Sequence, residues 1–169
     1  LMEQLLPSED PEAARLIQTS FKKRKIKILL KTSVASLDLA QFEKVLMCVG
    51  RRPNTEGLGL KEAGIELDDK GFIKVDQGLK TSADGIYAIG DIIGGHMLAH
   101  VASAEGIVAA QNALGKESRV DYSLVPNCIY SRPQIASCGL SEAGARNAGF
   151  KVKVGKFPFQ GVGKAHAID

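Results

Sequence analysis

The residues best suited to chemistry lie between Thr81 and His100, in the stretch TSADGIYAIGDIIGGHMLAH. An apolar segment, Ile86 to Ile89, runs into Gly90-Asp91. Glycines follow, and from Leu98 the apolar residues recur at helical spacing. In an open α/β sheet, ligands bind at the carboxyl ends of strands, where glycines let the backbone approach and a helix N-terminus offers unpaired N–H groups. Asp91 could then accept hydrogen bonds from ligand hydroxyls, while residues 97–100 present N–H groups to a polar edge. The combination suits a sugar-alcohol chain attached to an aromatic ring.

A simpler interpretation of the same residues is purely structural. Asp91 could cap the next helix, and the glycines could form an ordinary turn. The spacing by itself leaves both interpretations open.

The elements before this stretch predict an α/β half-domain. A helix begins at Pro11 with Asp10 as its cap, and basic residues end it. Its expected apolar face consists of Ala13, Leu16, Ile17, Ser20 and Phe21. Strands are expected at 26–31 and at 42–50, and the apolar run from Val45 to Val49 is typical of a strand buried on both faces of a parallel sheet.

The later elements follow from turn and cap signals. A helical turn closes at Gly64, two strands flank a turn over 68–71, and a third strand covers 86–89. A helix over 98–114 is ended by Gly115. Beyond it the pattern predicts strands around Arg132-Pro133, a short helix capped by Ser141 and closed by Gly149, and a strand over 151–159. We expect boundaries near residues 52 and 119, and find no internal repeat.

Composition excludes several functional classes. The net charge of +3 is mild, and the densest basic run lies at a predicted helix end, where cations complement the helix dipole, so nucleic-acid binding is not expected. No apolar run approaches the roughly 20 residues that cross a bilayer, so we expect a soluble, intracellular protein without a membrane role. Cys48, Cys128 and Cys138 lack the spacing of a metal or redox site and are interpreted as small buried residues.

Longer motifs resemble a known family. TSADGIYAIGD resembles the second flavin-binding motif of flavoproteins with two dinucleotide-binding domains, and GHMLAH is similar to the dihydrolipoamide dehydrogenases in particular. VLMCVGRRPNTEGLGLKEAGIELDDKGFIKVD, VDYSLVPNCIYSRPQIASCGLSEAGAR and VKVGKFPF also resemble that family of pyridine nucleotide-disulfide oxidoreductases. The resemblance covers nearly the whole chain.

The resemblance implies the fold and its division. The fold class is α/β, with parts of two Rossmann-like dinucleotide-binding domains, for FAD and NAD, followed by the start of an α+β dimer-interface domain. Residues 1–52 would form the C-terminal half of the NAD-binding domain, 53–118 the returning segment of the FAD-binding domain, and 119–169 the start of the dimer-interface domain.

The resemblance also implies the cofactor contacts. FAD would be bound by Asp91, whose carboxylate bonds the ribityl chain, and by Met97, Leu98, Ala99 and His100. Gly50 matches the position where the backbone passes close to NAD. Val34 matches an adenine contact, and an ordinary strand valine is an equally good explanation. No catalytic or metal-ligating residue is assigned, because the family's catalytic histidine lies in an HPTxxE motif that this chain does not reach.

The implied activity is oxidation of protein-bound dihydrolipoamide, with electrons passing through a redox disulfide and FAD to NAD. The implied partners are a second copy, giving a homodimer, and the lipoyl domains of 2-oxo acid dehydrogenase complexes, in the cytoplasm or the mitochondrial matrix. Alternatives are another flavin disulfide reductase, or a truncated, non-catalytic dimerisation or regulatory module.

Parts of the family pattern are missing. The redox CxxxxC and both GxGxxG motifs would precede Leu1, so we expect a piece of a longer protein that is inactive by itself. Only ASLDLAQFEK separates KTSV from VLMCVG, where the family has several strands. Those strands are either deleted or omitted from the sequence, and we favour omission.

Overall fold

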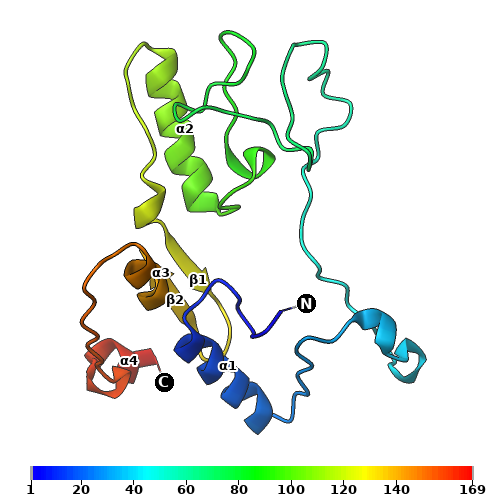
Figure 1. Cartoon of the computed structure of the whole chain (residues 1–169), viewed down its shortest axis with the longest axis vertical. Helices are drawn as coiled ribbons and strands as arrows, with labels where there is room; N and C mark the ends of the chain where they lie inside the picture. Colours follow the sequence, from blue (N-terminus) through cyan, green and yellow to red (C-terminus); the bar gives the residue numbers. More distant parts are fainter. Residues whose placement is uncertain (1, 169) are drawn as a thin grey trace. The chain divides into compact units, whose positions relative to one another are not determined.

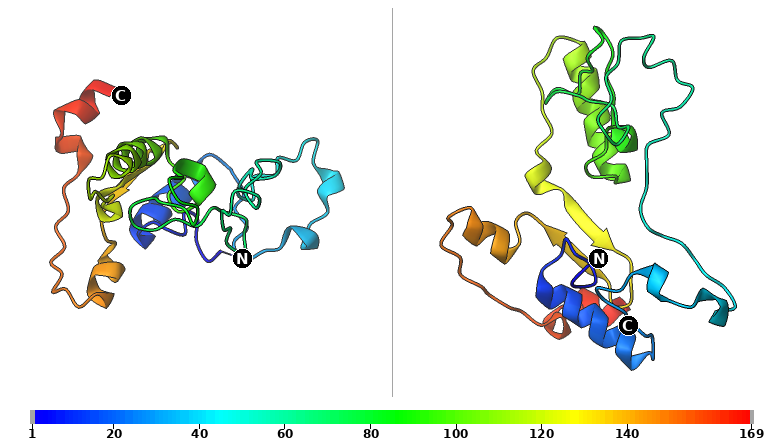
Figure 2. Two further views of the ribbon diagram at one scale, coloured as in Figure 1. Left: turned by 90° about the horizontal axis from the view of Figure 1, so that it is seen from above. Right: turned by 45° about the vertical axis from the view of Figure 1, so that its right-hand side comes forward.

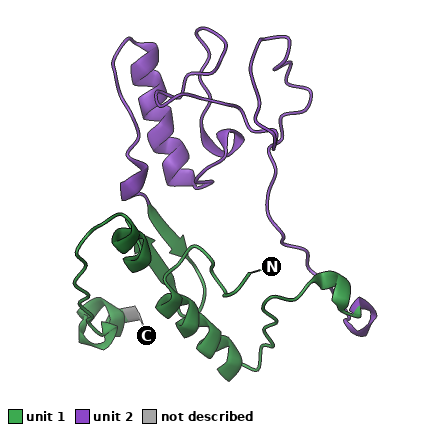
Figure 3. Cartoon of the chain, viewed as in Figure 1, with its two compact units in different colours: residues 1–38, 126–169 green, residues 39–125 purple. Residues whose placement is uncertain are grey.

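The computed structural model describes residues 2–168 (Figure 1). The chain divides into two compact units, residues 1–38 with 126–169 and residues 39–125, coloured separately in Figure 3.

The first unit is built on helix α1, Pro11–Lys23. Asp10 is its N-cap, Pro11 its first residue and Glu12 lies in the first turn, while Lys22 and Lys23 lie in the last turn, as the cap signals predict. The buried residues are Ala14 and Ile17, so the predicted apolar face is only partly correct. Leu16, expected on that face, is exposed.

The remainder of this unit forms a hairpin and short helices. Strands β1 (Pro126–Ile129) and β2 (Ile135–Cys138) pair antiparallel, from Pro126 opposite Cys138 to Ile129 opposite Ile135, which confirms the two strands predicted around Arg132-Pro133. Helix α3 (Glu142–Asn147) starts at Ser141, whose hydroxyl accepts the Gly144 N–H, as predicted. The other elements are the 3-10 helices η1 (Val34–Ser36) and η5 (Phe159–Gly161) and helix α4 (Gly163–Ile168).

The second unit packs irregular extended chain against helix α2, Ala99–Ala113. Two antiparallel bridges, Leu67 with Ile73 and Lys80 with Tyr87, mark the tight turns of the extended part. Its 3-10 helices are η2 (Leu39–Gln41), η3 (Gly90–Ile93) and η4 (Tyr122–Leu124). The core consists of Leu79, Val108 and Ala109, with Val75, Tyr87, Ile93 and Val120 packed around it.

Glycines end α2 and α3 where the sequence predicts. Gly115 and Gly149 have φ of +78° and +84°, a left-handed conformation that other residues adopt at a cost. This turn lets the N–H of Lys116 reach back to the Gln111 carbonyl at 3.0 Å, and that of Phe150 to the Ala145 carbonyl at 3.0 Å. Carbonyls that the helix leaves unpaired are thereby satisfied.

Six predicted strands are wrong as regular strands. Residues 26–31, 42–50 and 151–159 have no strand assignment, the two strands predicted around the turn 68–71 form only the bridge of Leu67 with Ile73, and 86–89 contributes only the Tyr87 bridge. In the run expected to be buried on both faces, Leu46 and Val49 are each 87% exposed. A strand ladder requires neighbouring chain, and within residues 2–168 none pairs with this run, so its strand propensity yields extended but exposed backbone.

The expected burial of the cysteines is also wrong. Cys48, Cys128 and Cys138 are all exposed. Cys48 lies in the same exposed apolar run, and Cys128 and Cys138 lie on the two-stranded hairpin, which is too small to bury both faces. In the part of the chain that the structure describes, no helix has the length and apolar character needed to cross a bilayer.

The Asn112 side chain joins three segments of the second unit. Its amide nitrogen donates to the Gly78 carbonyl at 2.9 Å and to the Ser118 carbonyl at 3.0 Å, and its oxygen accepts the Ser118 N–H at 2.8 Å. We predict that Asn112→Ala lowers the free energy of local unfolding by about 1–3 kcal/mol, because partly buried backbone groups lose their partners. Native-state hydrogen exchange of α2 peptides would measure this, with Gln111→Ala as control. Equal protection in the two variants would contradict it.

Candidate functional site

The Gly90-Asp91 turn lies in η3, directly before the loop that leads into α2. The preceding residues are extended but not a ladder strand, so the placement of Asp91 at the end of a regular strand is corrected to a position after a single bridge. Helix α2 begins at Ala99 with Leu98 as N-cap, which confirms the predicted start. Both views in Figure 2 show α2 alongside the chain that forms η3.

Small residues allow this turn to approach α2 closely. Gly90 has φ +75°, and a Cβ added there would lie 3.3 Å from the Ala102 Cβ. Similarly, a Cβ on Gly106 would lie 3.3 Å from the Ile89 Cδ1. Side chains at either glycine would push the turn and the helix apart, so the sequence specifies this contact through residues that lack a Cβ.

The Asp91 carboxylate remains accessible at the end of this turn. Its side chain is 57% exposed, and Oδ2 lies 3.3 Å from the Nη1 of Arg51, whose side chain is 69% exposed. An ion pair this exposed contributes only about 0–1 kcal/mol. A ligand hydroxyl can therefore compete with Arg51 for the carboxylate.

The predicted flavin-contacting segment forms the entrance to α2. Met97 and Leu98 are half-buried, whereas Ala99 and His100 are exposed. Leu98, the N-cap residue, makes no side-chain hydrogen bond that caps the helix.

Gly50 and Val34 lie in different units. Gly50 has φ +123°, and a Cβ added there would meet no atom within 4 Å, so the backbone there is open to a ligand. The next residue is Arg51, and its ion pair with Asp91 places the Gly50 segment near the Gly90-Asp91 turn. Val34 begins η1 in the other unit and is 62% exposed, so it lies in a 3-10 helix, not a strand.

The structure identifies two residues that the sequence interpretation missed. Glu105, on α2, is only 2% exposed, and its carboxylate accepts the Gly90 N–H at 2.6 Å and the Tyr122 hydroxyl at 2.8 Å. The available signal was an acidic residue on the apolar face formed with Val101 and Val108. Burial, and then the bond to Glu105, raise the pKa of Tyr122 to about 12.

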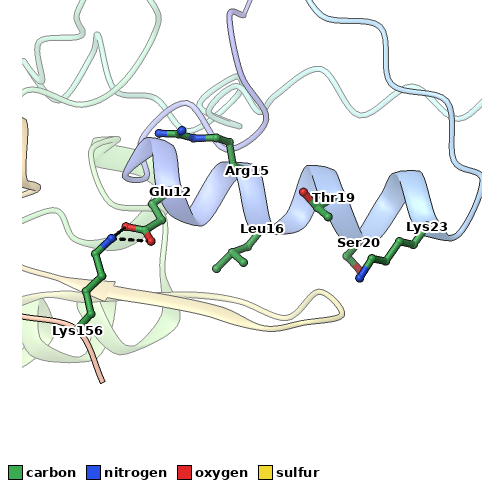
Figure 4. Close-up of a pocket in the computed structure, with 7 residues that line it drawn as sticks. All are labelled: Glu12, Arg15, Leu16, Thr19, Ser20, Lys23 and Lys156. Carbon is green, nitrogen blue, oxygen red and sulfur yellow. Dashed lines mark hydrogen bonds and ion pairs between the residues drawn. The ribbon is translucent and has the colours of Figure 1, made fainter. Parts of the chain in front are cut away.

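Grooves also lie beside the Gly90-Asp91 turn and along α1. A groove of about 480 Å³ adjoins the turn and is lined by Val75, Asp76, Gln77, Leu79, Ile93, Gly94, Gly95, His96, Glu105 and Tyr122. A second, open groove in the first unit follows α1, where the Lys156 ammonium binds both oxygens of Glu12 (Figure 4). The hydrogen bond from Lys156, and then its charge, lower the pKa of Glu12. Residues 2–168 contain no cluster of His, Cys, Asp and Glu able to hold a metal.

Family comparison decides the assignment of the fold. Residues 1–106 match the family described as Pyridine nucleotide-disulphide oxidoreductase, and residues 125–169 match its dimerisation domain. The chain belongs to this family. The predicted fold class, an α/β fold followed by the start of a dimerisation domain, is thereby confirmed.

Two curated relatives named dihydrolipoyl dehydrogenase match nearly the whole chain. Dihydrolipoyl dehydrogenase of Thermus scotoductus is 43% identical over 183 residues, covering 97% of this chain and 40% of the relative. Dihydrolipoyl dehydrogenase of Mycobacterium tuberculosis is 41% identical over 182 residues, covering 96% of the chain and 39% of the relative. The chain therefore spans about two fifths of the length of the curated relatives it matches.

Solved structures of this family have the same fold. LpdA from Mycobacterium tuberculosis superposes with a TM-score of 0.84 at 30% identity, covering 99% of this chain and 40% of that one. The HOCl-induced flavoprotein disulfide reductase RclA from Escherichia coli gives 0.87 at 27% identity, covering 99% and 42%. This similarity extends over both units of the chain.

The family implies the use of FAD and of NAD or NADP. The residues at the Gly90-Asp91 turn fit a flavin: the Asp91 carboxylate is exposed and acceptor-only, and a Cβ on Gly95 would meet open space. The open backbone at Gly50 likewise fits close approach of a nucleotide. These positions are compatible with the sequence-predicted contacts, which remain predictions.

The raised pKa of Tyr122 predicts a distinct titration. Because its folded pKa of about 12 exceeds the ordinary 10.0, the folded state favours the neutral phenol, through burial first and then through the bond to Glu105. This contribution to stability is complete below pH 10 and is lost as the pH rises through 12. Rapid-mixing titration of tyrosinate absorbance should show this late component in the wild type and lack it in Tyr122→Phe. An unchanged titration curve in the variant would contradict the assignment.

Proposed function

We propose that this chain is the part of a flavin-dependent dihydrolipoyl dehydrogenase that completes the FAD site and leads into the dimerisation domain. The observation that carries the proposal is the exposed Asp91 carboxylate on a glycine turn held against α2. Oxidised FAD, when bound, supplies the two-electron acceptor between a thiol pair and the nicotinamide. The complete protein would oxidise protein-bound dihydrolipoamide and reduce NAD.

The roles of this chain's own residues in that reaction are binding and electrostatic. Asp91 accepts hydrogen bonds from the ribityl hydroxyls and so fixes the long axis of the cofactor. Met97, Leu98, Ala99 and His100, at the start of α2, would hold the flavin ring near the positive end of the helix dipole, which would favour negative charge there. Gly50, and Val34 at the adenine, would contact NAD.

The proposed assembly follows from the same assignment. The match of residues 125–169 to a dimerisation domain supports a homodimer. Lipoyl domains of 2-oxo acid dehydrogenase complexes would be the electron donors, in the cytoplasm or the mitochondrial matrix. The division into 1–52, 53–118 and 119–169 is part of this proposal.

Two other functions compete with this one. The similarity to RclA supports another flavin disulfide reductase as a candidate, and its test is the electron donor that the purified protein accepts. The other competitor is a non-catalytic dimerisation or regulatory module. The intact mass of the native gene product separates it from the enzyme: a mass near 18.0 kDa supports the module, and the two- to threefold larger size of the relatives supports the enzyme.

Asp91→Ala tests the flavin assignment. We predict that FAD affinity in the complete gene product falls about 10- to 100-fold, because a charge-assisted hydrogen bond to a ribityl hydroxyl is lost. Asp91→Asn, which retains an acceptor without the charge, should fall between wild type and alanine. Flavin absorbance after gel filtration reports retention.

Asp84→Ala is the matched control for this experiment. Asp84 is an exposed carboxylate of the same unit that pairs with Lys80 at 2.7 Å. It should retain flavin like the wild type. Equal flavin content in the Asp91 and Asp84 variants would sink the assignment of Asp91 to the ribityl chain.

A further inference from the structure

The buried carboxylate of Glu105 has no role in the proposed function, yet it accepts a hydrogen bond from the backbone of the Gly90-Asp91 turn. Its side chain lies on the same face of α2 as Val101 and Val108, among apolar residues, and is 2% exposed. An ionised carboxylate in such surroundings is costly unless donors compensate it. Both of its oxygens have a donor here: Oε2 accepts from Gly90 N at 2.6 Å, and Oε1 from the Tyr122 hydroxyl at 2.8 Å.

The bond to Gly90 fixes the orientation of the Ile89–Gly90 peptide unit, one residue before Asp91. Gly90 has φ +75°, and its N–H donates to the Glu105 carboxylate on α2. A Cβ added at Gly90 would lie only 3.3 Å from the Ala102 Cβ, so little space remains for the turn to move toward α2. The attraction to Glu105 opposes movement outward, so both directions are restrained.

Tyr122 restrains the opposite end of the same loop. The His96 ring stacks on the Tyr122 ring with centroids 5.8 Å apart and an interplanar angle of 17°. Since Tyr122 also donates to Glu105, the first residue of the loop 90–96 and its last residue are both tied to one side-chain pair. We call Glu105 and Tyr122 the loop clamp.

We propose that Glu105 is a positioning residue: through the loop clamp it holds the loop 90–96 in the conformation that presents the Asp91 carboxylate to the ribityl chain of FAD. This inference rests on the proposed function for the identity of the ligand. The restraint on the loop itself does not depend on any ligand, because all its contacts are within the chain.

The loop clamp is tested first without flavin. Hydrogen exchange of a peptide covering 86–96 is measured in the flavin-free, complete gene product for the wild type, Glu105→Ala, Glu105→Gln and Tyr122→Phe. We expect exchange about tenfold faster in Glu105→Ala, because the hydrogen bonds to Gly90 and to Tyr122 are both lost. Tyr122→Phe loses only its own bond to Glu105, so we expect a smaller increase. Glu105→Gln should remain near wild type, because its amide oxygen still accepts from Gly90 and its amide nitrogen can donate to Tyr122.

FAD affinity is then measured for the same variants by flavin fluorescence. Glu105→Ala should bind FAD about tenfold more weakly, and Glu105→Gln should restore affinity to within about threefold of the wild type. Glu117→Ala, which removes an exposed carboxylate of the same unit, is the control and should match the wild type in both measurements. Exchange of the α2 peptide 107–114, which carries the core residues Val108 and Ala109 of the same unit, should stay constant throughout, which excludes general destabilisation of that unit.

The outcomes separate the two proposals. Unchanged exchange of 86–96 in both Glu105→Ala and Tyr122→Phe would overturn the loop clamp, whatever binds there. Faster exchange with undiminished FAD affinity would overturn the positioning role. If the wild type binds no FAD, the proposed function fails while the exchange data still test the clamp. If Glu105→Ala does not fold, Tyr122→Phe is used in its place, because this substitution nearly conserves side-chain volume. Its hydrogen exchange over 86–96 then tests the loop clamp, and its FAD affinity tests the positioning role.

Discussion

The close contact between α2 and the Ile89-Gly90 segment is the constraint on which the second unit depends. It is made by residues without bulk on both sides, Gly90 and Gly106 with Ala102, and it leaves room for one buried acid, Glu105. Farther along the same helix, Val108 and Ala109 form the apolar core with Leu79 of the extended chain. A helix thus serves as the rigid support for a loop that has almost no regular structure of its own.

The charged side chains of this unit make both buried and exposed interactions, and the two kinds contribute differently to stability. The Glu105 carboxyl group is buried and each of its oxygens accepts one hydrogen bond, so losing a donor would leave a buried oxygen unsatisfied. The Arg51–Asp91 pair is exposed and weak, which leaves Asp91 available to a ligand. The same few residues therefore combine a fixed backbone with an exchangeable side-chain partner, which is the combination that a cofactor-binding loop requires.

The regular sheet of the first unit consists of the hairpin β1–β2. The hairpin β1–β2 forms because its two strands are adjacent in sequence and each supplies the other's hydrogen bonds. The run from Val45 to Val49 in the second unit has equal strand character but no such neighbour among the described residues, so its apolar side chains are exposed.

The sequence by itself determined the local features: the start of α1 at Pro11, the start of α2 at Ala99, the Ser141 cap, the hairpin around Arg132-Pro133, and the closing glycines Gly115 and Gly149. Each depends on residues within a few positions of one another, and the family motifs are equally local. Only the tertiary structure decided which apolar residues are buried, that the three cysteines are exposed, and that Glu105, Tyr122 and Arg51 surround the Gly90-Asp91 turn. Those outcomes depend on contacts between residues 15 to 40 positions apart, and neither propensity nor spacing encodes which distant partner a side chain will meet.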